Sequence, residues 1–108
     1  MTNNGGVPIS FTIRCEEQGD TLVMFVAGEL DMAAKGRLVS EADWQRHDVK
    51  AVVIDMSELE FMDSTGLSDI VSMSVAAEAE GVTVTVRAAR ANVRRVFDIT
   101  GMARFLED

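Results

Sequence analysis

The sequence has few of the residues that small proteins use for covalent or metal cross-links. Its 108 residues include one cysteine, Cys15, one histidine, His47, one proline and no tyrosine. A single cysteine cannot form an internal disulfide, and Cys15 with His47 falls short of the four ligands of a structural zinc site. The chain must therefore fold by burying apolar side chains, and we expect Cys15 to be a buried, inert thiol.

Membrane-spanning and cationic segments are also lacking. No apolar run approaches the ~20 residues of a membrane span, and the first ten residues lack the basic and apolar segments of a secretory signal. The net charge is -8, and a phosphate-binding surface needs an excess of cations. We therefore predict a cytoplasmic protein, a monomer or weak dimer, without nucleic-acid or membrane partners.

The 47% hydrophobic share is arranged in patterns that alternate between strand and helix. Period-two alternation and short β-branched runs predict strands at residues 9–17, 21–30, 50–56 and 82–87. The run at 21–30 is typical of a strand covered on both faces. Apolar residues at helical spacing predict helices from Met32, after a cap at Asp31, to about Arg46, from residue 64 to a stop near Gly81, and from residue 91 to a stop near Gly101.

This order of elements, β-β-α-β-α-β-α, predicts the fold class. Strands that alternate with helices imply crossovers and therefore a mainly parallel sheet. The first two strands, joined by a short turn, add an antiparallel hairpin. We predict a single α/β domain over residues 9–108, with helices packed against a mixed sheet, preceded by a flexible tail at residues 1–8.

The segment ELEFMDSTGLSDI at residues 58–70 carries the candidate chemistry, because Ser64 and Thr65 lie where a helix is predicted to begin. A serine hydrolase needs a base, but the only histidine, His47, lies beyond the strand at 50–56. At about 3.3 Å per residue that strand alone separates them by roughly 20 Å, and no G-x-S-x-G elbow surrounds Ser64. We therefore disfavour catalysis and expect His47 on the surface.

The carboxylates of this region allow two interpretations. Asp55, Glu58, Glu60 and Asp63 could hold Mg²⁺ or act as acid and base. They could also be the ordinary solvated charge of a loop before a helix, where the helix dipole favours negative side chains. We favour loop charge, and the sequence predicts no metal and no cofactor.

Three segments resemble the STAS domain of anti-sigma factor antagonists. They are VAGELDMAA at residues 26–34, VVIDMSELEFMDSTGL at residues 52–67 and ANVRRVFDITGM at residues 91–102. The first resembles the family's strand-to-helix turn, the second its central strand and phosphorylation motif, and the third its late helix. The resemblance spans about residues 9–106 and implies a STAS fold in a bacterial regulator of transcription that is not an enzyme.

In that family the hydroxyl directly after the aspartate of the motif is phosphorylated, and here that residue is Ser64. The resemblance implies that the unphosphorylated protein binds a serine-kinase anti-sigma factor, releases a sigma factor, and is restored by a serine phosphatase after phosphorylation. Residues flanking the phosphosite would be Asp31, Asp63, Thr65 and Gly66. The implied partner-binding residues are Gly28, Glu29, Leu30, Asp31, Glu60, Asp63, Ser64, Ser68 and Asp69.

Physical reasoning about Ser64 agrees with a switch but keeps an alternative open. Free backbone N–H groups at a helix start can hold a phosphate, and the acidic neighbours would leave it without a cation. Alternatively Ser64 simply caps the helix. We expect Thr65 to cap or pack, and Gly66 to leave room for a kinase. Rival functions are a STAS subunit of another complex, such as a stress-sensing scaffold or lipid-transport assembly, and a small acidic enzyme.

Overall fold

The structure is a computed structural model that describes residues 11–44 and 48–107. Its strands are β1 (Phe11–Gln18), β2 (Thr21–Leu30), β3 (Ala51–Met62) and β4 (Thr83–Arg87), and its helical segments are η1 (Met32–Ala34), α1 (Arg37–Ala42), α3 (Ser64–Glu78), α4 (Ala91–Ile99) and η2 (Ala103–Phe105). The predicted tail and the predicted surface position of His47 lie outside the described residues. In the described part of the chain, no helix has the length and apolarity needed to cross a membrane.

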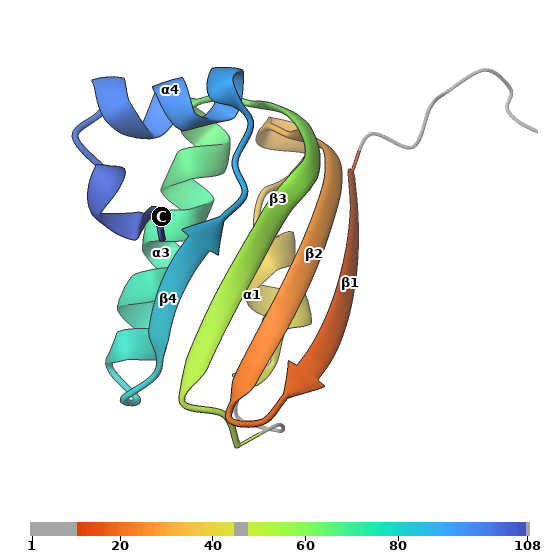
Figure 1. The fold of residues 1–108 in the computed structure, drawn as a ribbon, viewed down its shortest axis with the longest axis vertical. Helices are drawn as coiled ribbons and strands as arrows, with labels where there is room; N and C mark the ends of the chain where they lie inside the picture. The colour runs from red at the N-terminus through yellow and green to blue at the C-terminus, as the bar shows by residue number, and fades with distance from the viewer. Residues whose placement is uncertain (1–10, 45–47, 108) are drawn as a thin grey trace, which may run out of the picture.

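The four strands form one sheet in the order β1-β2-β3-β4 (Figure 1). β1 pairs antiparallel with β2, whereas β2, β3 and β4 run parallel. This arrangement confirms the predicted mixed, mainly parallel sheet with an N-terminal hairpin. Because the strand order advances in one direction, right-handed crossovers place α1 and α3 on the same face of the sheet.

The core therefore forms on only one face of the sheet. Alternate residues of the central strands, such as Met24 and Ile54, are fully buried there against Ile70, Met73 and Phe97. On the opposite face Val23 and Val53 are buried, whereas Phe25 and Ala27 remain partly exposed. The prediction that the strand at 21–30 is covered on both faces is therefore wrong for its second half, because helices on both faces require a reversal of strand order that this topology lacks.

The predicted helix from Met32 to about Arg46 is wrong over residues 32–44, because this part of the chain is broken into short pieces, and the predicted end of the helix lies outside the described residues. Gly36 and Asp43 adopt left-handed backbone angles, with φ of 85° and 46°, and leave α1 only six residues between them. The helical spacing still has a structural basis, because Ala34, Leu38 and Ala42 are all buried. The later stops near Gly81 and Gly101 are confirmed, with φ of 80° and 76°.

β3 is longer than the strand predicted at residues 50–56 and continues to Met62 over 12 residues. Leu59 and Met62 are buried, whereas Glu58 and Glu60 are exposed along the strand. The interpretation of Glu58 and Glu60 as loop charge is therefore wrong, because both residues lie on strand β3. Shifts in register between β2 and β3, next to Ala27 and Gly28, accompany the extension.

Asp55 also departs from the expected solvated charge, because it is buried and paired with Arg87 of β4. Arg87 Nε donates to Asp55 Oδ2 at 2.8 Å, and the backbone N–H and hydroxyl of Ser57 donate to Oδ1 at 3.0 and 2.7 Å. Burial raises the pKa of Asp55, but the hydrogen bonds from Arg87 and Ser57 outweigh burial, so the pKa is lowered overall.

We expect Asp55→Asn to lower the free energy of unfolding at pH 7 by roughly 1–2 kcal/mol. This loss is smaller than for a fully buried ion pair, because solvent around the partly exposed Arg87 screens the interaction. A carboxyl whose pKa is lowered on folding stabilises the protein above its unfolded pKa, near 3.9, and this stabilisation disappears as the pH falls through the folded pKa. Urea unfolding at about pH 7 and pH 2.5 measures the difference. Glu41→Gln, which breaks the exposed ion pair with Arg37, is the control. An equal loss at both pH values for Asp55→Asn would contradict this account.

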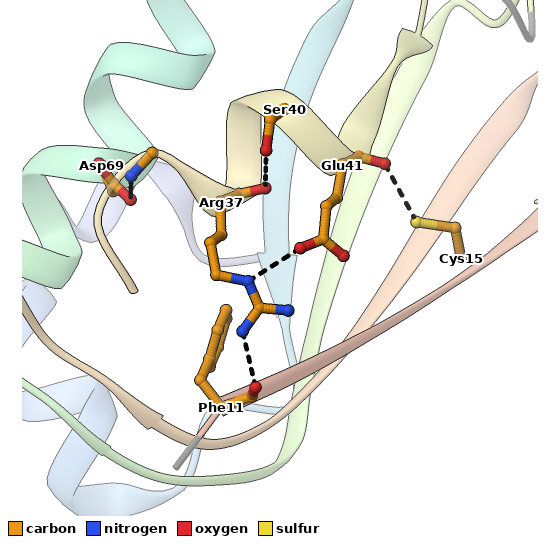
Figure 2. Close-up of polar contacts among 7 residues, drawn as sticks. Phe11, Cys15, Arg37, Ser40, Glu41 and Asp69 are labelled. Carbon is orange, nitrogen blue, oxygen red and sulfur yellow. Dashed lines mark hydrogen bonds and ion pairs between the residues drawn. The ribbon is translucent and has the colours of Figure 1, made fainter. Parts of the chain in front are cut away.

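β1 forms the edge of the sheet, and its second half is not covered. Cys15 is exposed, so the expectation of a buried thiol is wrong. Its Sγ lies 3.7 Å from the carbonyl oxygen of Glu41 on α1 (Figure 2). Partial burial of the thiol, and secondarily the charge of Glu41, raise the pKa of Cys15, so the thiol stays protonated at neutral pH.

Candidate functional site

Two aspartates begin the helical segments that follow β2 and β3. Leu30 and Met62 are the last residues of these strands and are paired in the sheet, so Asp31 and Asp63 follow at the same end of the sheet. Asp31 Oδ1 accepts a hydrogen bond from Ala33 N, and Asp63 Oδ1 accepts one from Gly66 N, both at 3.0 Å. The predicted cap at Asp31 is confirmed, although the segment it caps is the short η1.

Ser64 is the first residue of α3, and Asp63 is its cap. Ser64 is exposed and Thr65 is half-buried, and neither side chain has a hydrogen-bond partner within the described residues. The alternative that Ser64 caps the helix is therefore wrong, and so is a capping role for Thr65. The Ser64 hydroxyl has no structural task in the described part of the fold.

Gly66 is buried where α3 crosses the ends of β2 and β3. A Cβ atom at this position would lie 2.8 Å from Leu30 Cγ and 2.9 Å from Met62 Cγ, and closer still to the Leu30 carbonyl oxygen. These distances are shorter than van der Waals contact. The expectation that Gly66 leaves room for a kinase is wrong, because the glycine instead lets α3 lie against the sheet.

Ser64 borders an open hollow between η1 and α3 with a volume of about 520 Å³. The lining residues are Met32, Lys35, Ser64, Thr65, Ser68, Asp69 and Ser72. Asp69 is only 8% exposed, and its Oδ2 accepts a hydrogen bond from Gly36 N at 2.8 Å (Figure 2). This bond ties the turn before α1 to α3 and holds the two walls of the hollow together.

Sequence reasoning missed three of these lining residues, namely Met32, Lys35 and Ser72. The spacing of Ser64, Ser68 and Ser72, four residues apart on one helix, is a signal that could have identified Ser72. Met32 and Lys35 carry no such signal, because the break at Gly36 decides where η1 lies. Met32 is 72% exposed, which is unusual for a large apolar side chain.

Lys35 changes the electrostatics expected for a phosphate on Ser64. The acidic neighbours in the sequence suggested that no cation would be near, and this is wrong because Lys35 lines the same hollow. Its charge balances that of Asp69, so the lining residues are neutral as a set. A phosphate would add about -1.5 to -2 charges at pH 7 and make the hollow strongly negative.

The other predicted partner-binding residues do not line the hollow. The Leu30 side chain is fully buried, so it supports Gly66 and has no surface of its own. Glu29 and Glu60 are exposed, and Gly28 is half-buried with a φ of 95°. Among the described residues, no group of three His, Cys, Asp or Glu side chains is placed to hold a metal ion.

Comparison with known proteins finds one family and several similar structures. A sequence model of the STAS domain matches residues 12–107. The chain is similar to the anti-sigma factor antagonist SpoIIAA in its unphosphorylated form, with a TM-score of 0.77 and 23% identity over 90% of this chain and 87% of that chain. For an anti-sigma factor antagonist from Mycobacterium paratuberculosis the TM-score is 0.71, with 28% identity over 93% and 86% of the two chains. For the phosphorylated form of the Bacillus cell fate determinant SpoIIAA the TM-score is 0.67, with 25% identity over 90% of each chain.

Proposed function

This chain belongs to the STAS domain family, and on that premise we propose that it is an anti-sigma factor antagonist. In the unphosphorylated form it binds a serine-kinase anti-sigma factor through the surface around Ser64 and so frees a sigma factor. Phosphorylation of Ser64 by that kinase ends the binding, and a serine phosphatase restores it. The protein itself is a phosphoacceptor in the cytoplasm and not an enzyme.

The observation that carries this proposal is the position of the Ser64 hydroxyl. It is exposed at the start of a 15-residue helix, has no hydrogen-bond partner among the described residues, and opens onto the hollow. Because Asp63 already caps the helix, a phosphate on Ser64 removes no stabilising contact. The helix dipole and the charge of Lys35 would favour the phosphate within the folded protein.

The surroundings of Ser64 also suit a protein partner. Met32 offers an apolar contact beside the hollow, and Ser68 and Ser72 present small polar side chains along the outer face of α3. Asp31 and Asp63 lie beside this surface, while Gly28, Glu29 and Glu60 extend it along the ends of β2 and β3. Asp69 supports the surface through Gly36, so its role is to position the wall rather than to meet the partner with a free carboxylate.

Phosphate transfer from the cognate kinase tests the proposal. Incubation with its serine-kinase anti-sigma factor and ATP is expected to add one phosphate, located on Ser64 by peptide mass spectrometry. Ser64→Ala should abolish transfer, whereas Thr65→Ala, which alters the neighbouring hydroxyl of the same hollow, should still accept phosphate. Modification that persists in Ser64→Ala, or no modification by any cognate kinase, would refute the proposed switch.

A further inference from the structure

Lys35 has no charged partner in the described part of the chain. It is exposed on the turn between η1 and α1, and no hydrogen bond or ion pair of its ammonium group is found within residues 11–44 and 48–107. The neighbouring cation, Arg37, is already engaged, because its guanidinium donates to the Glu41 carboxylate and to the Phe11 carbonyl (Figure 2). Among the residues that line the Ser64 hollow, Lys35 alone carries a positive charge.

The backbone of Lys35 is held close to α3. The N–H of the next residue, Gly36, donates to Oδ2 of Asp69 at 2.8 Å, and Asp69 is buried on α3 (Figure 2). Asp69 follows Ser64 by five positions in the sequence, which corresponds to about 7.5 Å along the axis of an α-helix. A lysine carries its ammonium group at the end of a flexible four-carbon stem. Lys35 can therefore direct its charge along the hollow toward the start of α3.

A phosphate on Ser64 would enter the same hollow. Ser64 lines the hollow from α3, and Lys35 lines it from the end of η1. A phosphoserine has three strong acceptor oxygens, and an ammonium group offers three donors. The nearby carboxylates of Asp31, Asp63 and Asp69 repel a phosphate, and each of them already accepts a backbone hydrogen bond. Lys35 is therefore the side chain of the hollow lining that attracts the phosphate.

We propose that phosphorylated Ser64 forms an ion pair with Lys35 across the hollow, and that this pair ties the turn after η1 to the start of α3. The inference rests on the proposed phosphorylation of Ser64 and adds a second element to that switch. Phosphorylation changes the surface in two ways, because it adds negative charge and also takes up the positive charge of the lining. The Ser64 surface that a partner meets therefore loses its free cation.

Titration of the phosphate by phosphorus-31 NMR tests the ion pair without a kinase or an anti-sigma factor. Phosphoserine is placed at position 64 during translation through a reassigned stop codon. The second pKa of a phosphoserine is ordinarily about 6, and a nearby cation lowers this pKa because it favours the dianion. We expect the phosphate pKa to be lower by roughly 0.5 in the chain with Lys35 than in Lys35→Met, a modest difference because the pair is exposed. The difference should shrink at high salt.

Two further variants separate the ion pair from a general effect of net charge. Lys50→Met removes the same charge from an exposed position just before β3, at the opposite end of this strand from Asp63. It should leave the phosphate pKa as it is in the wild-type background. Lys35→Arg keeps a cation at the hollow and should keep the lowered phosphate pKa. Circular dichroism checks that each variant is folded.

Hydrogen exchange of the Gly36 amide gives a second readout, because this N–H joins the turn to α3. Phosphoserine at position 64 should slow its exchange several-fold, and Lys35→Met should remove the slowing. A phosphate pKa that is the same with and without Lys35, or an amide that is not slowed by the phosphate, would overturn the proposal. Because phosphoserine is introduced directly, such a result leaves the kinase reaction standing, whereas a failed kinase assay refutes the switch and not the ion pair.

Discussion

Ser64→Glu is expected to weaken binding of the anti-sigma factor about a hundredfold, whereas Ser64→Ala should bind like the wild-type protein. The lining of the hollow carries one cation, Lys35, and one anion, Asp69, so the lining itself is neutral overall, although acidic side chains surround it. A fixed negative charge at Ser64 removes this balance. Like-charge contact and desolvation at an interface cost several kcal/mol, and about 3 kcal/mol corresponds to a hundredfold loss of affinity.

Titration calorimetry with the cognate anti-sigma factor measures this loss, and the phosphorylated protein should show at least the same effect. Thr83→Glu is a suitable control, because it adds one negative charge at an exposed position of β4 that does not line the hollow. The loss should also shrink at high salt, since screening weakens exposed charge interactions. Equal affinities for Ser64→Ala and Ser64→Glu would rule out an electrostatic switch.

Gly66→Ala is expected to lower the free energy of unfolding by about 2–4 kcal/mol. Replacing glycine with alanine inside a helix ordinarily stabilises it by roughly 1 kcal/mol, so the expected sign here is opposite to the general trend. The reason is steric, because the new methyl group would overlap the Leu30 carbonyl and crowd the Leu30 and Met62 side chains. Relief requires α3 to move away from the sheet, and overpacking of this kind is destabilising.

Urea unfolding compares Gly66→Ala with Ser68→Ala, an exposed position of the same helix that is expected to change stability by less than about 0.5 kcal/mol. The displaced helix start should also lower the affinity for the anti-sigma factor, since Ser64 lies on the same turn. A Gly66→Ala protein as stable as the wild type would show that α3 can shift freely at this contact.

Several features were predictable because they depend on neighbours along the chain. Apolar spacing identified the buried face of α3, and the glycines at 81 and 101 marked turns that need a positive φ. The place of Ser64 at a helix start followed from the same periodicity. Periodicity did not predict which of Asp63 and Ser64 caps the helix. Both side chains suit that role, and the residue at which the helix begins decides between them.

By itself the sequence determined the order of strands and helices, the mainly parallel sheet, and the position of Ser64 at the start of a helix. These follow from the periodicity of apolar residues, which reflects burial on one face of each element. Only the tertiary structure decided that Lys35 borders the hollow, that Asp69 holds Gly36, and that Gly66 lies against Leu30. Each of these contacts joins residues more than 25 positions apart, and no local pattern encodes such a distance. The exposure of Cys15 was also decided by the tertiary structure, because helix α1 covers only part of the edge strand β1.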